Sequence, residues 1–365
     1  MDVNQDELTL LRKVRDDVAE PSTTAIIAGR AALLDAAAPR AAQATRKRRA
    51  LRRAGWTSLG VVGAAGIAAA LVLTNIVGLA GWRGGADPAA ADTLTSAAVA
   101  AIHNADPVVG PGQYLKIETN AVGIVQTSTV DQPGRFISYE LASTDQLYVP
   151  ADKNDDWVWV RPASTVYKTF GAESAQLARN QVEQQTKEFP NGDGTLRAAA
   201  GGFYGSPAVV SPTALAALPR DPHQLLNQIY RMTLGAGSGP DSEAFVYIAD
   251  TLRSGIVPAD LRAALYRAAA LIPGVSITEK QANLDGRIGV AIGIADGPVT
   301  RQDIVIDPST GLMIGERSVY LKAADGLPAG TVAGFTAIRT SVVDSAPAGG
   351  TLCGDVNVCS GSAGK

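Results

Sequence analysis

The sequence has little histidine, little cysteine and few aromatic residues. Its 365 residues include only 2 His and 2 Cys, and Phe, Trp and Tyr together make up 5%. A nucleophilic site needs a base within hydrogen-bond reach of the attacking group. His103 ends one expected helix and His223 begins another, where a solvated first-turn residue is the simpler interpretation. We therefore expect a protein that is not an enzyme.

The motifs of nucleotide and metal sites are also missing. There is no G-x-x-x-x-G-K-[ST] and no dinucleotide fingerprint. The stretch "DKNDDW" (residues 152–157) spaces its oxygens like the start of a calcium loop. However, Trp157 stands where that loop needs glycine and Ala163 where it needs glutamate. We expect no cofactor and no bound metal.

One long stretch contains no charge at all. Residues 57–80 include no Asp, Glu, Lys, Arg or His, and Trp56 and Trp82 bracket them. Roughly 20 apolar residues span the hydrocarbon core of a bilayer, and tryptophan is enriched at its two interfaces. We predict one transmembrane helix over residues 56–82, with the two tryptophans as interface anchors. The alternative, a buried core helix, is seldom free of charge over six turns.

Basic residues crowd the amino side of this stretch and set its expected orientation. They are Arg46, Lys47, Arg48, Arg49, Arg52 and Arg53. Cytoplasmic flanks hold the positive excess. The first 55 residues carry a net charge of +4 and the remainder −7. Such a cluster sets topology and binds anionic lipid more often than it binds nucleic acid, which we consider an unlikely partner.

Five segments follow from this orientation. They are a cytoplasmic helical tail (1–45), a basic juxtamembrane segment (46–55), the span (56–82), an exported domain (83–345) and a flexible C-terminal tail (346–365). The leader is longer than that of a cleaved signal peptide, so an uncleaved anchor is favoured, although "ADPAAADT" resembles a cleavage region. We expect a cell-membrane protein with its N-terminus in the cytoplasm and its C-terminal domain outside.

The cytoplasmic tail carries two apolar stripes at helical spacing. The first consists of Leu8, Leu11 and Val14, and the second of Ile26, Ile27, Leu33 and Leu34. Short isolated helices are marginal in water, so these stripes need something to cover them. They pair with one another, lie on the membrane or bind a cytoplasmic protein.

The two cysteines, Cys353 and Cys359, lie close together in the C-terminal tail. This spacing, in an exported segment, favours a small disulfide loop over two free thiols. No histidine lies nearby, so the pair does not form a zinc site.

Within the exported domain, helical and strand-like patterns come in runs. A helix is expected over 90–106, strands over 113–170, including separate ones at 134–141 and 145–150, and helices from 211 to 274. Strands return over 275–344. Residues 171–189 read as a surface helix or an insertion, and 190–207 as a loop. Such runs indicate an α+β fold. We predict a curved, half-barrel-like antiparallel sheet packed on helices.

Four aromatic residues fall on consecutive strand-like segments: Trp157, Trp159, Tyr167 and Phe170. They are candidates for lining an apolar ligand cavity, or they form the core of the domain under the helices.

Several phrases resemble known proteins. "DELTLLRKVRDDVAEP", "VPADLRAALYRAAALIPGV", "IDPSTGLMIGERSV" and "GTVAGFTAIRTSVVD" resemble a family of uncharacterised actinobacterial single-pass membrane proteins. The hairpin "DIVIDPSTGLMIGERSV" is similar to one in lipoprotein-carrier and sigma-regulator domains, which implies an open half-barrel around helices. The overall topology resembles membrane anti-sigma factors. Residues 1–55 lack Cys and His, however, so the zinc-stapled domain of some members cannot form here.

These observations favour a non-enzymatic envelope protein. The exported domain would sense or bind a ligand, and the tail would report to a cytoplasmic partner such as a sigma factor. The alternatives are a carrier or scaffold for a lipid-like molecule and an extracellular hydrolase. The hydrolase requires a pocket that gathers carboxylates such as Asp303 and Asp307, which the sequence places at turns and strand ends.

Overall fold

A computed structural model of the chain describes residues 84–104, 106–129, 132–188, 190–203, 211–324 and 326–353. The predicted cytoplasmic tail, basic segment, span and tryptophan anchors lie outside these residues, as does Cys359. Within the described ranges, no helix is long and apolar enough to cross a membrane. The chain divides into two compact units, 1–64 and 65–365, and every described residue belongs to the second.

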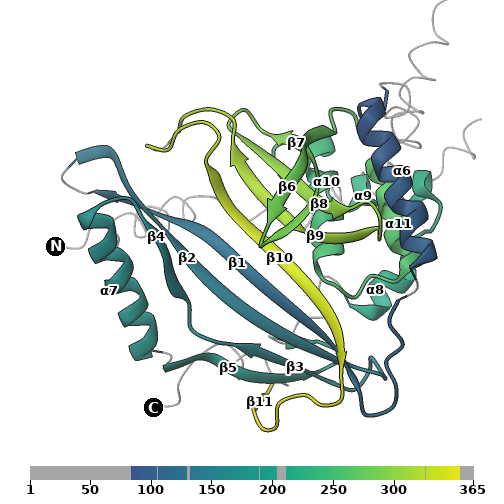
Figure 1. The fold of residues 1–365 in the computed structure, drawn as a ribbon, viewed down its shortest axis with the longest axis horizontal. Helices are drawn as coiled ribbons and strands as arrows, with labels where there is room; N and C mark the ends of the chain where they lie inside the picture. The colour runs from purple at the N-terminus through teal and green to yellow at the C-terminus, as the bar shows by residue number, and fades with distance from the viewer. Residues whose placement is uncertain are drawn as a thin grey trace, which may run out of the picture. The chain divides into compact units, whose positions relative to one another are not determined.

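One large sheet organises the described residues (Figure 1). Its strands follow the order β11-β5-β3-β2-β1-β10-β9-β8-β7-β6, and β4 also pairs with β2. The strands are β1 Tyr114–Thr129, β2 Gln132–Pro150, β3 Asp156–Arg161, β4 Thr165–Thr169, β5 Pro190–Ala199, β6 Ser276–Leu284, β7 Arg287–Asp296, β8 Thr300–Asp307, β9 Leu312–Tyr320, β10 Val332–Val343 and β11 Thr351–Leu352. All neighbours pair antiparallel except β11 with β5. The α+β class is confirmed, but the sheet is open and uncurled where we expected half-barrel curvature.

Strand β2 is a single strand of 19 residues, where the sequence predicted two. Its register with β1 runs without a break from Phe136 to Pro150. The polar stretch from Ser143 to Asp145, which suggested a gap, stays in the ladder because β1 supplies backbone partners along its whole length. The other edge of β2 is shared: β4 pairs with residues 139–142 and β3 with residues 146–148.

Six helices occur among the described residues: α6 Pro88–His103, α7 Ala172–Glu188, α8 Pro212–Ala217, α9 Pro222–Met232, α10 Pro240–Arg253 and α11 Ala259–Ala269. Their starting points follow from local chemistry. The side chains of Asp87, Ser211 and Asp221 each accept a hydrogen bond from a first-turn amide, and proline follows each cap. Proline fits the first helical position because its missing N–H would have no partner there.

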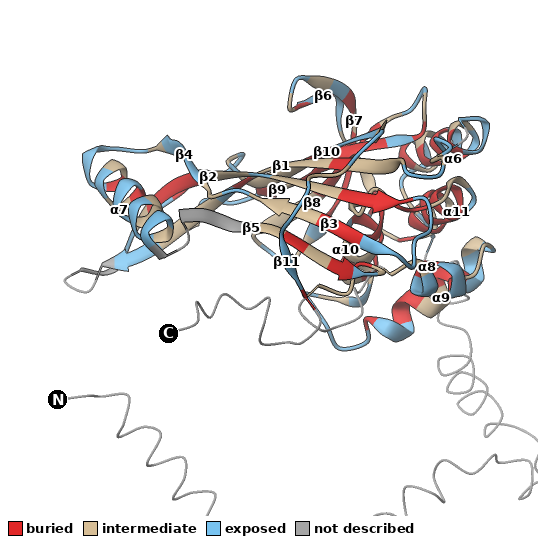
Figure 2. Cartoon of the chain, turned by 90° about the horizontal axis from the view of Figure 1, so that it is seen from below, coloured by how far each residue is buried: buried red, intermediate tan, exposed pale blue. Residues whose placement is uncertain are grey.

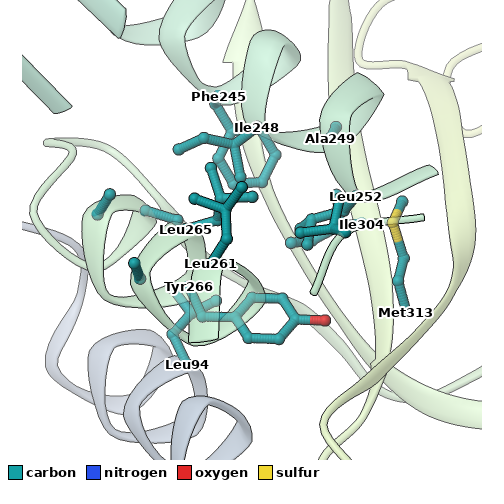
Figure 3. Close-up of a cluster of buried hydrophobic side chains, with 14 of the residues drawn as sticks. Leu94, Phe245, Ile248, Ala249, Leu252, Leu261, Leu265, Tyr266, Ile304 and Met313 are labelled. Atoms are coloured by element: carbon teal, nitrogen blue, oxygen red, sulfur yellow. The ribbon is translucent and has the colours of Figure 1, made fainter. Parts of the chain in front are cut away.

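Helices α6, α9, α10 and α11 pack together, and α10 lies against β7, β8 and β9. Figure 3 shows the core between them, where Phe245 and Ile248 of α10 meet Leu261 and Leu265 of α11; all four are fully buried. Buried residues concentrate where the sheet meets these helices (Figure 2). The core therefore lies on one face of the sheet.

The predicted turn at Asp307–Gly311 is confirmed and also serves as a contact with α6. Asp307 accepts hydrogen bonds from the Ser309 amide and hydroxyl, and Gly311 has a φ of +68°. A Cβ on Gly311 would collide with backbone atoms of Ala97 and Ala101 in α6. Glycine is required here twice, for its backbone conformation and for the close approach.

Three segments needed the structure to assign them. Within residues 171–189, Ala172–Glu188 form helix α7, which contacts β2, β4 and β5. Residues 190–199, predicted as a loop, form β5, because β3 offers a partner strand and Leu196 and Ala198 bury their side chains. Part of the predicted C-terminal tail, Thr351–Leu352, forms β11 beside β5.

Candidate ligand pocket

A pocket of about 560 Å³ lies between the sheet and the segment that joins α10 to α11. Leu115 of β1 and Val149 of β2 form one wall, and Leu252, Ile256 and Val257 form the opposite one. Met313 of β9 and Ile338 of β10 also line it. This volume and apolar lining are typical of small-molecule sites.

Glycine allows the α10–α11 connection to approach the sheet. Gly255 has a φ of +71°, and a Cβ there would lie 3.0 Å from Cγ2 of Ile117 in β1. The chain turns at this point and buries Ile256 and Val257, which are 6% and 4% exposed. The sequence signal that ends α10 therefore also builds the wall of the pocket.

Charged residues in the lining are mostly cationic. The cations are Lys153, Arg262, Arg287 and Arg339, whereas Asp106 is the one carboxylate among the lining residues. The surroundings of three of these residues show which charges are already satisfied.

Arg287 connects two strands where their pairing has ended. The β9–β10 ladder extends to the pair Ala337 and Gly315. Beyond it, the Arg287 guanidinium donates to the carbonyl oxygens of Ile314, at 2.9 Å, and Ile338, at 2.6 Å. Burial lowers the pKa of Arg287, and the nearby charge of Arg339 lowers it further. The buried Nε of Arg287 has no hydrogen-bond partner among the described residues.

Arg262 is 9% exposed and is held on two sides. It donates to the Val257 carbonyl at 3.0 Å and to Asp106 Oδ1 at 2.9 Å. The other oxygen of Asp106 accepts from the Ala259 amide at 2.7 Å. Asp106 therefore caps α11, for which Pro258 provides no side-chain cap, and its charge is already engaged.

A second hollow, of about 1,090 Å³, lies over β1, β2 and β10. We call it the aromatic groove, because Phe136, Tyr167, Phe170 and Phe335 line it. Val122 and Ala142 also line it and alternate along their strands with Ile117 and Val149 of the core, so the groove lies on the face away from the helices. The rings of Tyr167 and Phe335 meet edge to face, with centroids 6.5 Å apart.

The four aromatic residues that the sequence singled out occupy different environments. Tyr167 and Phe170 line the aromatic groove, at 56% and 47% exposure. Trp157 is buried in the main core, and its Nε1 donates to the Lys153 carbonyl at 3.0 Å. Trp159 packs against Phe203, with ring centroids 5.2 Å apart. The four side chains do not line one cavity, and none of them lines the pocket beside α10.

The other residues that the sequence singled out either stabilise the fold or lie outside the described ranges. Cys353 is buried and disulfide-bonded, while its predicted partner Cys359 is not described, so their pairing stays a prediction. Asp303 is fully buried against two arginines, and Asp307 serves the turn. Among the described residues no group of three or more His, Cys, Asp or Glu is placed to hold a metal ion.

The known structures that are similar to this chain are very distant from it. No family model and no curated protein matches the chain. The structure is similar to the MucA/MucB complex of Pseudomonas aeruginosa, at 11% identity and a TM-score of 0.19, over 71% of this chain and 58% of that one. It is also similar to a DUF1329 family protein of Desulfovibrio piger, at 13% identity and a TM-score of 0.16, over 68% of this chain and 92% of that one. Scores this low carry no argument about fold or function.

Sequence reasoning missed the pocket because its lining comes from segments far apart in the chain. Arg287 and Arg339 stand in strand patterns where a charge usually faces water. Arg262 gave the one available signal. It falls beside Leu261 in a helix of 11 residues, 8 of which are buried, so its charge needed a partner.

Proposed function

We propose that this chain is a membrane-anchored envelope protein that is not an enzyme, and that its exported domain binds an apolar or amphiphilic molecule. The pocket between the sheet and the α10–α11 connection carries this proposal. It combines an apolar lining with a few polar groups, which is the usual composition of a small-molecule site. Its one lining carboxylate, Asp106, is engaged in helix capping and in an ion pair, which argues against hydrolytic chemistry there.

Membrane anchoring is part of the same proposal and is supported by the sequence. The uncharged residues 57–80 follow six cationic residues, so the N-terminus is expected in the cytoplasm. A periplasm-active or surface-active reporter fused after Lys365 should be active, and the same reporter fused before Met1 should be silent. The reverse pattern would reject the orientation.

The second part of the proposal is that the cytoplasmic tail binds a signalling partner. The stripe of Leu8, Leu11 and Val14 and the stripe that includes Leu33 and Leu34 need a covering surface, and a sigma factor is the partner that we propose. A full-length chain with Leu8→Glu and Leu11→Glu should lose binding to a purified sigma factor from the same organism. Equal binding by the parent and the variant would remove these stripes from the interface.

A carrier or scaffold for a lipid-like molecule is the second candidate, because the same pocket would serve it. In that case the Leu8→Glu and Leu11→Glu variant would carry the lipid-like molecule in the cell as well as the parent does.

Mass spectrometry of organic extracts tests the ligand-binding claim. The full chain, purified from its native host and exchanged into phosphatidylcholine nanodiscs, should release an apolar molecule that empty nanodiscs from the same preparation lack. An extract identical to that of empty nanodiscs would count against ligand binding.

A further inference from the structure

We propose that the aromatic groove is a second binding site, which takes a small organic amine through the carboxylate of Glu140 and the rings around it. This goes beyond the proposed function, because the amine is a different molecule from the apolar ligand and binds on the opposite face of the sheet. A buried carboxylate without a partner, next to exposed aromatic rings, carries the proposal.

Glu140 is a buried carboxylate that lacks a counter-charge. It is 8% exposed and lines the aromatic groove from the middle of β2. Its carboxylate forms no ion pair and accepts no hydrogen bond from any described residue. Glutamate is almost never buried unless it is paired, because a buried charge is costly. A cation from outside the chain would supply the missing partner.

The carboxylate of Glu140 is also within reach of a ligand. The unpartnered Nε of Arg287 is sealed inside the protein, whereas the unpartnered oxygens of Glu140 are not. The side chain lines the hollow directly. A small molecule in the aromatic groove can therefore contact these oxygens.

Two other charged residues of the groove are already engaged. Arg317 pairs with Asp303 at 3.1 Å and with Glu279 at 2.8 Å. Asp285 pairs with Arg339 at 3.2 Å. Neither Arg317 nor Asp285 therefore brings an unpaired charge into the groove.

Lys168 is the remaining cation among the described residues that line the groove. It is the direct cross-strand neighbour of Glu140 in the β2–β4 ladder. Its Nζ nevertheless lies 5.0 Å from the centroid of the Phe170 ring and forms no ion pair with any described carboxylate. The groove thus already holds one ammonium group against a ring, which is the contact that an amine ligand would repeat at Glu140.

Aromatic rings favour an organic cation over a metal ion as the partner of Glu140. Strand β4 pairs with residues 139–142, which brings Tyr167 and Phe170 beside Glu140, and Phe335 meets Tyr167 edge to face. The face of an aromatic ring attracts a cation. A metal ion needs several oxygen ligands, and among the described residues no group of three or more His, Cys, Asp or Glu is placed to hold one. An amine needs only one carboxylate and a ring.

Ligand-observed fluorine NMR on the full chain in phosphatidylcholine nanodiscs tests this proposal. Three probes carry the same para-fluorophenyl ring on an ethyl chain and end in an ammonium, a hydroxyl or a carboxylate group. Empty nanodiscs give the background for each probe. We expect the ammonium probe to bind about tenfold more tightly than the alcohol, since charged hydrogen bonds are stronger than neutral ones. The carboxylate probe should bind most weakly, because Glu140 repels it.

Two matched substitutions at the cross-strand pair separate a specific site from a general disturbance of the groove. Glu140→Gln should lose about tenfold in affinity for the ammonium probe, while its affinity for the alcohol stays unchanged. Lys168→Gln should bind the ammonium probe at least as tightly as the parent, because it removes a cation that repels the probe. Glu140→Gln keeps the shape of the side chain and removes a buried charge, so its melting temperature should equal or exceed that of the parent.

Four results would overturn the proposal. Equal affinities of the parent for the ammonium and alcohol probes, or an ammonium affinity that Glu140→Gln leaves unchanged, would reject the amine site. An equal loss of ammonium binding in Glu140→Gln and Lys168→Gln would show a general disturbance of the groove. A lower melting temperature of Glu140→Gln would show that this carboxylate serves the fold instead. None of these results bears on the pocket under the helices, which the extraction experiment tests separately.

Discussion

The two faces of the sheet bury their side chains by different means. Toward the helices, Ile292, Ile304 and Ile306 point into the main apolar core. On the opposite face of the same strands, Val305 and Ala291 belong to a much smaller cluster. The helix-covered face gains stability from area removed from water, whereas the other face has little apolar area to bury.

The open face compensates with a network of ion pairs. Asp303 is fully buried and accepts from Arg301 at 2.6 and 3.0 Å and from Arg317 at 3.1 Å, and Arg317 also pairs with Glu279 at 2.8 Å. Gly293 of β7 makes room for this carboxylate, because a Cβ there would collide with it. Two arginines, Arg301 and Arg317, fix the geometry of Asp303 on this face.

This difference explains why an apolar pocket occurs on one face and an aromatic groove on the other. The pocket beside α10 is enclosed by a second layer, whereas the groove is bordered by side chains that remain partly in water. We therefore place the ligand under the helices.

The largest expected effect compares one phenylalanine on each face. Phe245→Ala should lower the free energy of unfolding by about 3–5 kcal/mol, because its ring is fully buried and the cavity would not refill. Phe136→Ala, in the aromatic groove at 38% exposure, should cost about 1 kcal/mol or less. Urea titration of both variants measures the two losses. Equal losses would contradict the contrast between the faces.

The next effect concerns the ion network of the open face. Asp303→Asn should destabilise the fold by about 1–3 kcal/mol, because two arginines lose a buried charged acceptor. Glu279→Gln is the matched control, since Glu279 is exposed and its loss leaves Arg317 paired with Asp303; it should cost about 0–1 kcal/mol. The same urea titration measures both losses of unfolding free energy. A larger loss for Glu279→Gln than for Asp303→Asn would show that Glu279, and not Asp303, contributes most to this network.

The smallest effect is a pH dependence on the helix-covered face. Glu316 lies 2.6 Å from Arg253 Nε, without hydrogen-bond alignment, and accepts from Gln302 at 3.0 Å. Burial raises the pKa of Glu316, since it outweighs the attraction of Arg253. Burial alone would lower the pKa of Arg253, but Asp250 and Glu316 outweigh it and raise that pKa. Glu316 is the more deeply buried of the two, so burial disfavours its charged form more than its neighbours can offset.

The sign of the effect follows from the raised pKa of Glu316. The stabilisation by the protonated carboxyl is complete below the unfolded pKa and is lost as the pH rises through the folded pKa. The melting temperature of the parent should therefore fall relative to Glu316→Gln between about pH 4 and pH 7. A difference between the parent and Glu316→Gln that stays constant with pH would show that burial does not control this carboxyl.

Much of the fold was predictable because it depends on local signals. The caps at Asp87, Ser211 and Asp221 and the turn at Gly311 announce their elements within a few residues. Strand β5 was not predictable, because glycine and aspartate around Gly194 suggest a loop and only pairing with β3 overrides them. The four aromatic residues lie in different environments for a similar reason: alternation along a strand gives the face of each side chain but not which layer covers that face.

The most direct test of the central claim repeats the extraction with one blocked hollow at a time. Leu115→Trp fills the pocket under the helices, and Val332→Trp narrows the aromatic groove on the other face. We predict that the apolar molecule disappears from extracts of Leu115→Trp and remains in those of Val332→Trp, with both variants folded. Retention in Leu115→Trp together with loss in Val332→Trp would contradict the account and move the ligand to the open face.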